Sequence, residues 1–321
     1  MRTPRPFLQG LLPLAAVVAL ASTLANPLSL AGQALTCDLS GYTAASGLSA
    51  TMSGGLLTLD WQGAGTERLS LSLAVRAGTP RVDELAISSS SIPRTVIASD
   101  AAFEFKIVEG FRRISNQQLV PLRALDVELT SEVVDRYKWD VFWDAPLDLR
   151  DAPPQNNPPP MEGVTDQPGL PRSASEISRA DASYAVSTCR VTRDGRTLSV
   201  AFPGMRLGSF AGELVISVYR GTNLIRAEAV ASTELPSVAY KYDVGITGLD
   251  LNEESEVRWR DIASQMQAYG LRGPVNEDHV VLRAANRLVV AETNGGALAA
   301  FPPPHTFFWA REIEITVGNN W

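Results

Sequence analysis

The sequence predicts an all-β protein with one short helix, built as a large two-sheet antiparallel β-sandwich. Most of the chain consists of short runs in which apolar and polar residues alternate, and glycine or proline marks most of the gaps. One hairpin pattern also occurs twice, at 69–87 and 214–230. In both copies a run enters an Arg/Gly/Thr turn, and a second run leaves it carrying an acidic residue, Glu84 or Glu228. Two similar hairpins suggest two sheets packed against each other.

The predicted strands follow the alternating runs along the chain. The runs are 56–61, 69–75, 82–87 and 103–108, and then 197–202, 214–219, 224–231, 238–242, 257–259, 280–282, 287–291, 297–301 and 307–317. One stretch, 130–143, has apolar residues at helical spacing instead. Thr130 or Ser131 is placed to cap its start, and Glu132 lies in its first turn. We expect this helix to lie across the sandwich.

The N-terminal residues 1–34 are typical of an export signal. Arg2 and Arg5 precede an apolar core that is too short to span a bilayer comfortably. Small residues follow, so cleavage is expected after Ala25 or Ala34. An uncleaved anchor helix is the alternative. We therefore expect a protein that is exported to the periplasm or to the extracellular space.

Two β halves, 35–150 and 181–321, are expected on either side of a Pro-rich linker at 151–180. Eight prolines lie between Pro146 and Pro171, and such a composition cannot bury enough apolar surface to fold alone. A docking segment for a polyproline-binding partner is the alternative. The sequence ends just after the last predicted strand, and we expect that the second half is cut short there.

Cys37 and Cys189 each lie at the start of one predicted half. In an oxidising compartment they can form one disulfide. The bridge would close a loop of roughly 150 residues, worth about 4 kcal/mol on the chain-entropy model. Two separate buried thiols are the alternative.

Composition and charge exclude several classes of partner. The net charge is −7 and the pI is about 5.0, whereas nucleic-acid binding needs a concentrated basic surface. No second apolar run is long enough to span a membrane. The expected partner is therefore a glycan or another neutral polar ligand, or else a protein. We expect no nucleic-acid partner, no membrane span after signal removal and no cofactor.

Catalytic and metal-binding motifs are missing from the sequence. The chain has only two histidines, His279 and His305, whereas a catalytic zinc site usually takes three protein ligands. No Gly-x-Ser-x-Gly and no phosphate-binding loop occurs. We expect no metal site, and the sequence does not establish whether the chain is an enzyme.

Trp139 and Trp143 form the first candidate for ligand binding. They lie one turn apart on the predicted helix, and Asp144 follows directly. An aromatic face beside a carboxylate suits a sugar ring, because the ring stacks on the indole while its hydroxyls donate to the carboxylate. The alternative is that both indoles cover the edge of the sandwich.

Two polar clusters are further candidates. Amide and guanidinium groups of the 111–118 loop are common donors to sugar hydroxyls, although they are also ordinary loop residues. In the second cluster three prolines hold the backbone before His305 in a fixed direction. An acid–base pair with Glu312 or Glu314 is one interpretation, and an inert turn histidine is the other. The candidate ligand-binding residues of the two clusters are Arg113, Asn116, Gln117, His305, Arg311 and Glu312.

The turn-and-strand motifs Gly78–Leu85 and Asn223–Glu228 resemble those of the galactose-mutarotase-like supersandwich, a fold of accessory domains in glycoside hydrolases and polysaccharide lyases. This likeness covers about residues 50–317 and rests on strand order and spacing. A second set of motifs consists of Ser115–Leu119, Lys138–Trp139 with Phe142–Pro146, Val238–Asp243, and Pro302–His305 with Arg311–Glu312. These motifs resemble more closely a group of secreted bacterial proteins, in which the β-rich part precedes a PHP-type metallohydrolase domain. The resemblance implies that this domain would begin beyond Trp321.

The functional expectation is an exported carbohydrate-binding β-sandwich that acts as the non-catalytic accessory part of a larger hydrolase. One alternative is a self-sufficient sugar epimerase or polysaccharide lyase that uses His305 with Glu312 or Glu314. The other is a structural or partner-binding envelope protein that docks through its Pro-rich segment.

Overall fold

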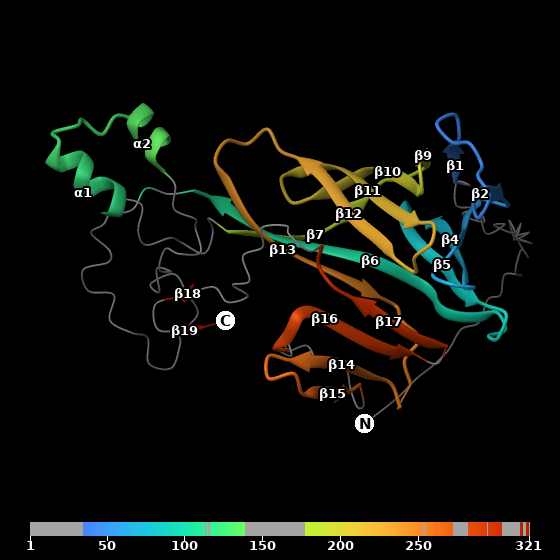
Figure 1. The fold of residues 1–321 in the computed structure, drawn as a ribbon. Coiled ribbons are helices and arrows are strands. Elements are labelled where there is room, and N and C mark those ends of the chain that lie inside the picture. The colour runs from blue at the N-terminus through green and yellow to red at the C-terminus, as the bar shows by residue number, and fades with distance from the viewer. Residues whose placement is uncertain are drawn as a thin grey trace, which may run out of the picture. The chain divides into compact units, whose positions relative to one another are not determined.

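The computed structural model describes residues 35–112, 114, 116–138, 177–252, 254–271, 282–293, 295–303, 315–316 and 319–320. These residues form mostly strands and two short helices (Figure 1). The predicted export signal and most of the Pro-rich linker lie outside them. The elements are β1 (Thr36–Asp38), β2 (Leu48–Ser53), β3 (Leu56–Gln62), β4 (Arg68–Arg76), β5 (Thr79–Ser88), β6 (Thr95–Phe111), α1 (Asn116–Ala124), α2 (Ser131–Tyr137), β7 (Ser178–Asp181), β8 (Ser183–Tyr184), β9 (Thr188–Asp194), β10 (Thr197–Leu207), β11 (Phe210–Tyr219), β12 (Ile225–Ser232), β13 (Val238–Thr247), β14 (Glu256–Asp261), β15 (Met266–Gly270), β16 (Ala284–Thr293), β17 (Gly296–Ala300), β18 (Ile315–Thr316) and β19 (Asn319–Asn320).

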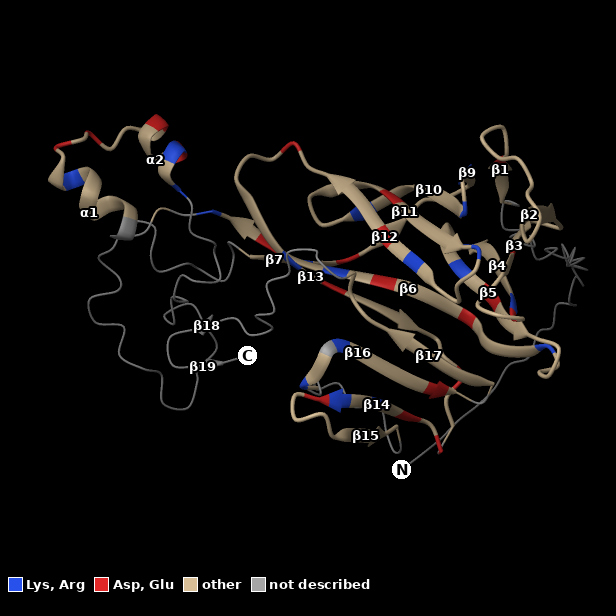
Figure 2. Ribbon diagram, in the orientation of Figure 1, with Lys and Arg blue, Asp and Glu red and all other residues tan. Residues whose placement is uncertain are grey.

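The two large sheets are each built on an antiparallel meander of consecutive strands. The seven-stranded sheet has the order β13-β6-β5-β4-β3-β2, with β7 beside β6. The six-stranded sheet has the order β1-β9-β10-β11-β12, with β8 beside β10. The two repeated hairpins, β4–β5 and β11–β12, therefore lie in different sheets, as the sequence predicted. Acidic and basic residues are interspersed along the described strands (Figure 2).

Two strands leave their own meander and join the other sheet. β1 precedes the first meander but pairs with β9 of the six-stranded sheet, and this pairing is parallel. β13 follows the second meander but pairs with β6 of the seven-stranded sheet, over residues 238–247. The prediction of purely antiparallel sheets was therefore wrong at β1. Each exchange therefore ties a strand from one end of a meander to the sheet built on the other meander by backbone hydrogen bonds.

One hydrophobic core lies between the two large sheets. It takes the inward residues of alternating strands, such as Leu57 and Leu59 from β3 and Leu198 and Phe202 from β10, all fully buried. Full burial of each such side chain contributes about 1.5–3 kcal/mol. Because the same cluster draws on both meanders, neither sheet has a core of its own.

Hairpin turns of both meanders reach the opposite sheet. In the β11–β12 turn, Gly221 donates its N–H to the carbonyl of Gln62 at 2.6 Å, and the carbonyl of Thr222 accepts from the indole of Trp61 at 2.9 Å. In the β4–β5 turn, the carbonyl of Gly78 accepts from the N–H of Val186 at 2.9 Å, just before β9. The repeated Arg/Gly/Thr turns are thus contacts between the sheets.

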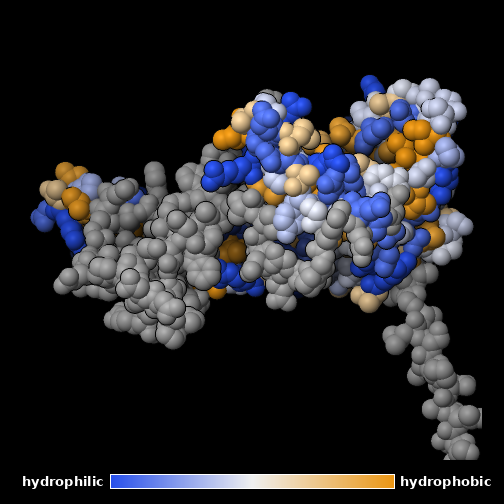
Figure 3. Space-filling view, turned by 90° about the horizontal axis from the view of Figure 1, so that it is seen from below, coloured by the Kyte–Doolittle hydropathy of each residue, from blue (hydrophilic) through white to orange (hydrophobic). Residues whose placement is uncertain are grey.

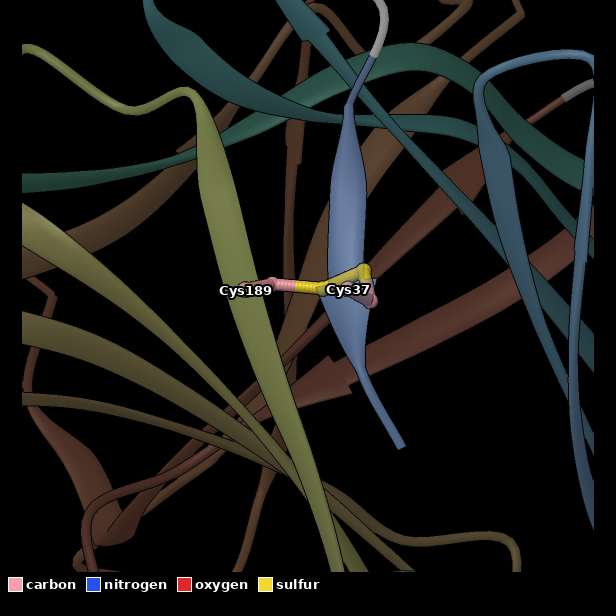
Figure 4. Close-up of a disulfide and its surroundings, with 2 residues drawn as sticks. All are labelled: Cys37 and Cys189. Atoms are coloured by element: carbon pink, nitrogen blue, oxygen red, sulfur yellow. A yellow bond between two sulfur atoms is a disulfide. The ribbon is translucent and has the colours of Figure 1, made fainter. Parts of the chain in front are cut away.

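Cys37 and Cys189 form a disulfide (Figure 4). They are directly paired across β1 and β9, with a Cα–Cα separation of 4.4 Å. The bridge therefore fixes the short β1 strand onto the six-stranded sheet. Of the two alternatives that the sequence left open, the structure has the bridge.

Glu109 of β6 holds the β10–β11 turn from the other sheet. Its carboxylate accepts from the backbone N–H of Ser209 at 2.9 Å and from the Ser209 hydroxyl at 2.7 Å. The side chain is only 8% exposed. Gly208 lies beside it with φ of +59°, and a Cβ there would lie 2.7 Å from the nearer carboxylate oxygen. The turn therefore needs glycine both for its backbone and for the space that Glu109 takes.

A third sheet, which the sequence did not predict, has the order β15-β14-β16-β17. The β16–β17 turn joins it to β6, because the Thr293 hydroxyl donates to the carbonyl of Ile97 at 3.1 Å. Asp261 organises its β14–β15 turn by accepting from the N–H groups of Ala263 and Gln265, both at 2.9 Å. These hydrogen bonds lower the pKa of Asp261, and the bond from the N–H of Gln265 is the largest cause.

The prediction of one short helix was wrong, because the described residues contain two. α2 begins where expected, with the Thr130 hydroxyl accepting from the N–H of Val133 at 3.3 Å, but it ends at Tyr137. Its valines pack against Ile114, Leu119 and Leu122 of the α1 region, which form a small separate cluster. The apolar contacts of α2 therefore lie with the α1 region, whereas the sequence led us to expect a helix across the sandwich.

Several strand boundaries differ from the prediction. The run 103–108 is part of the long β6, and β2, β9 and β15 were not predicted. The last residues of the predicted linker, 178–180, belong to β7. Leu282 is not in a strand, and most of the predicted strand 307–317 lies outside the described residues.

The disulfide should contribute strongly to stability, because it links residues 152 positions apart. We expect the double variant Cys37→Ala/Cys189→Ala to lose about 2–4 kcal/mol in the free energy of unfolding. Urea unfolding followed by tryptophan fluorescence measures this loss. An unchanged midpoint in the double variant would contradict the stabilising role.

The Glu109–Ser209 contact predicts different costs at two glycines with similar backbones. Gly195 has φ of +56°, and nothing lies within 4 Å of the place that a Cβ would take, whereas Gly208 has φ of +59° and faces Glu109. Both alanine variants strain the backbone by about 1 kcal/mol. Gly208→Ala should cost about 1–3 kcal/mol more, because it displaces the buried carboxylate from its donors.

Urea unfolding of four variants tests this difference: Gly195→Ala, Gly208→Ala, Glu109→Ala and the Glu109→Ala/Gly208→Ala double variant. The extra cost of Gly208→Ala should disappear when Glu109 is already alanine. Equal costs for Gly195→Ala and Gly208→Ala would show that Glu109 does not occupy that space.

Candidate functional site

The best candidate for a ligand site is a row of aromatic rings on β13 and at the start of β11, which we call the aromatic strip. It consists of Phe210, Tyr240 and Tyr242, and Val244 continues it along the strand. The rings of Phe210 and Tyr240 meet edge to face with centroids 5.1 Å apart. The centroids of Tyr240 and Tyr242 are 6.4 Å apart. Side chains from the β10–β11 turn and from β13 therefore form one continuous aromatic surface.

The strip lies on the core side of the seven-stranded sheet and is nevertheless exposed. Tyr242 pairs with Ile107 of β6, and Val244 pairs with Phe105; directly paired residues share a face. Ile107 and Phe105 are buried in the shared core. In contrast, Tyr240, Tyr242 and Val244 are 48%, 47% and 51% exposed. The shared core therefore reaches β6 and Ile246 near the end of β13, but it leaves residues 240–244 of β13 on this face exposed.

The ring contacts distinguish this strip from ordinary surface apolar residues. On the face that Figure 3 shows, hydrophobic residues reach the surface in several separate places among hydrophilic ones, and single exposed apolar residues need no explanation. Tyr240 and Tyr242 are different, because they lie in a row along one strand with tilted rings 6.4 Å apart and are both about half exposed. Such a row suits ligands with a flat, weakly polar face.

The polar groups nearest to the strip have structural roles. Glu109 pairs with Tyr240 across the strands, and its carboxylate is held by Ser209. Lys241 and Asp243 point to the opposite face of the sheet, where Lys106 is the cross-strand neighbour of Asp243 and forms an ion pair with Glu104 at 3.5 Å. This surface can therefore bind and orient a ligand. Glu109 would have to leave its hydrogen-bond donors before it could act as an acid or base.

A shallow hollow of about 430 Å³ on the outer face of the seven-stranded sheet is the second candidate. Its floor is a cross-strand row of short side chains, which are Ser49, Asp60, Ser70 and Ala86. Long side chains of Arg68 and Arg94 stand around it.

Charge pairing limits what this hollow offers. Arg94 is bound to Glu84, and this carboxylate, by hydrogen bonding and by its charge, raises the pKa of Arg94. The hollow therefore presents serine hydroxyls and the charges of Asp60, Arg68 and Arg94, and its aromatic lining residue, Trp61, is only 2% exposed. We therefore rank the hollow below the strip, because the hollow fits small polar ligands with little specificity whereas the strip fits a ring.

A further hollow of about 420 Å³ surrounds the disulfide and is lined by Cys37, Cys189, Asp38, Arg190 and Pro203 among others. A hydrogen bond from the N–H of Ser40, at 2.8 Å, is the main cause that lowers the pKa of Asp38. Because the disulfide and the β1–β9 pairing occupy this place, we regard it as structural.

Most ligand-binding residues predicted from the sequence lie outside the residues or side chains that the structure describes. This holds for Trp139, Trp143, Asp144, Arg113, His305, Arg311 and Glu312, and for the side chains of Asn116 and Gln117, whose backbone begins α1. They stay predictions. The disulfide pair is the part of the predicted set that the structure shows.

The aromatic strip was not predicted from the sequence, although its strand was. Tyrosine at alternate positions 240 and 242 was the available signal, because alternate residues of a strand share a face. The sequence does not show that β13 would join β6 beyond the cover of the other sheet. Phe210, in contrast, is separated from β13 by most of the second meander, and only the fold brings it to Tyr240.

Among the described residues, no group of three or more His, Cys, Asp or Glu side chains is arranged to hold a metal ion. Within the same part of the chain, no helix has the length and apolar character needed to cross a membrane. Comparison with known proteins finds no matching family model, no similar curated protein and no similar solved structure.

Tyr184 of β8 carries a buried hydroxyl for which no hydrogen-bond partner exists within the described residues. Burial raises its pKa from 10.0 to about 12. The side chain packs against the shared core, so the neutral form is the one that the fold favours.

A pH dependence follows from this shift. Between pH 10.0 and about 12, Tyr184 ionises in the unfolded chain but stays neutral in the folded one. Its contribution to stability is therefore complete below pH 10 and is lost as the pH rises through this range. We expect Tyr184→Phe to be as stable as the wild type or slightly more stable at pH 8, because the unpaired hydroxyl is gone.

Urea unfolding of both proteins at pH 8 and pH 11 tests the shift at Tyr184. The stability difference in favour of Tyr184→Phe should grow with pH. A difference that stays constant would mean that Tyr184 ionises alike in the folded and unfolded chain.

Proposed function

We propose that this protein is a carbohydrate-binding β-sandwich whose ligand stacks on the aromatic strip. The observation that carries the proposal is the row of Phe210, Tyr240 and Tyr242, with ring centroids 5.1 and 6.4 Å apart and both tyrosines about half exposed. The apolar C–H face of a sugar ring packs on a tyrosine, while the phenol hydroxyl remains able to bond a sugar hydroxyl.

An oligosaccharide or polysaccharide fits this surface better than a free monosaccharide. The strip follows β13 and is exposed at consecutive rings and at Val244, so it offers contact along a line. Aromatic side chains that are already held by neighbours lose little conformational freedom on binding. The net charge of −7 favours neutral over acidic glycans, because like charges repel.

The cellular setting of the proposal comes from the sequence. An export signal at 1–34 would place the chain in the periplasm or outside the cell, where glycans are available and where the Cys37–Cys189 bridge is stable. We propose that the chain acts as the substrate-binding accessory part of a larger hydrolase, as its likeness to secreted proteins with a PHP-type domain implies. Two large sheets packed through one core support the galactose-mutarotase-like supersandwich as its fold type.

Affinity electrophoresis through gels containing neutral polysaccharides tests the proposal. Suitable probes are hydroxyethylcellulose, xylan, galactomannan and laminarin. We expect retardation by at least one of them, and little effect of added salt, because stacking on a neutral ligand involves no ion pair. Tyr240→Ala and Tyr242→Ala should each weaken that binding by about tenfold or more, which is the usual effect of removing a central aromatic contact.

Tyr269→Ala is the matched control, since Tyr269 is 38% exposed but lies on β15 in the four-stranded sheet. It should bind like the wild type, and Tyr242→Phe should keep most of the affinity. Undiminished binding by both strip variants, or an equal loss in Tyr269→Ala, would remove the strip from the site. A loss in Asp60→Ala alone would place binding in the outer hollow.

A further inference from the structure

β13 has a long edge that none of the other described strands pairs with. It is the longest strand at the edge of any described sheet, with ten residues against eight in β12 and six in β2. Proline, bulges, short length and edge charges usually protect such edges. β13 carries the charges of Lys241 and Asp243, but it contains no proline and its pairing with β6 runs without a register shift.

The sequence of β13 is self-complementary in one antiparallel register. When two copies of the strand are aligned about Tyr242, Lys241 of each copy lies opposite Asp243 of the other. Tyr240 then lies opposite Val244, which is a favourable aromatic and β-branched pair. Small residues meet at the next position. The pairs are Tyr242 with Tyr242, Lys241 with Asp243, Tyr240 with Val244, Ala239 with Gly245 and Val238 with Ile246.

Neighbouring registers do not have this complementarity. Alignment about Lys241 brings two lysines together, and alignment about Asp243 brings two aspartates together, which is destabilising for directly opposite residues. In a register whose centre lies between two residues, the tyrosines of one copy share a face with the charged residues of the other copy. The charge pattern therefore selects the register about Tyr242.

We propose that this protein forms a symmetric dimer in which β13 pairs antiparallel with β13 of a second copy. The contact is isologous, so each favourable pair occurs twice about the two-fold axis. The pairing would continue the seven-stranded sheet into the second copy and bond those edge N–H and C=O groups of β13 that no described strand pairs with. This inference does not depend on glycan binding.

The dimer would also join the two aromatic strips. Tyr242 of one copy lies directly opposite Tyr242 of the other, on the face that carries the strip. A ligand chain could therefore contact rings of both copies. Because one pair of edge strands buries less than the roughly 1,200 Å² of a standard interface, we expect a weak, concentration-dependent dimer.

Register-specific cross-linking tests the proposal directly. Directly opposite residues have Cα atoms about 4.5–5.5 Å apart, which suits a disulfide. Tyr242→Cys should therefore form a covalent dimer under mild oxidation. Val244→Cys is the matched control, because it is equally exposed but would lie about 13 Å from its copy, four residues along the strand. The native cysteines are already bridged to each other.

Charge exchange gives a second, independent test by analytical ultracentrifugation. Lys241→Asp places like charges opposite Asp243 twice and should weaken dimerisation by at least about tenfold. The double variant Lys241→Asp/Asp243→Lys restores the opposite charges and should restore the dimer. Thermal unfolding of each variant checks that the fold is kept.

A wild-type protein that sediments as a monomer at every concentration would overturn the proposal. Equal cross-linking of Tyr242→Cys and Val244→Cys would overturn the register. If the wild type bound polysaccharide but sedimented as a monomer at every concentration, the dimer would be excluded and the proposed glycan binding would stand.

Discussion

The structure depends on the apolar core that the two large sheets share. Each meander buries one face, and the inward residues of β3 and β10 belong to the same cluster. Neither sheet can bury that face alone, since an isolated sheet exposes it to water. The polar contacts between the sheets reinforce this arrangement: the Gly221 and Thr222 backbone groups bind the end of β3, and Glu109 binds Ser209. Burial supplies the energy, and these hydrogen bonds fix how the sheets align.

The position of the aromatic strip follows from strand exchange. β13 leaves the second meander and joins β6, so its tyrosines lie on the core side of the sheet but beyond the cover of the other sheet. At the same point Phe210, at the start of β11, packs edge to face on Tyr240. A surface that elsewhere would be buried core thus becomes available for a ligand. The same exchange leaves the second edge of β13 open among the described strands.

The sequence predicted the parts of this architecture that depend on local pattern. Alternation located most strands of both meanders, and the repeated Arg/Gly/Thr turns correctly indicated two sheets. α1 was missed because Pro121 interrupts its helical pattern, and β15 was missed because its residues are all exposed and do not alternate clearly. The parallel β1–β9 pairing and the meeting of Phe210 with Tyr240 are long-range events that no local pattern encodes. For the site, the sequence indicated aromatic stacking at Trp139 and Trp143, which lie outside the described residues, so that this stays a prediction.

Native-state hydrogen exchange most directly tests whether β13 belongs to the shared-core unit. The β13 amides that donate to β6 should exchange only by global unfolding, with the same free energy and denaturant dependence as those of β6 and β10. This result would mean that the aromatic strip is held as rigidly as the core. If β13 amides exchanged at a much lower free energy while β6 and β10 stayed protected, the strip would lie on an independently opening strand. The claim that the aromatic strip is held by the shared core would then be wrong.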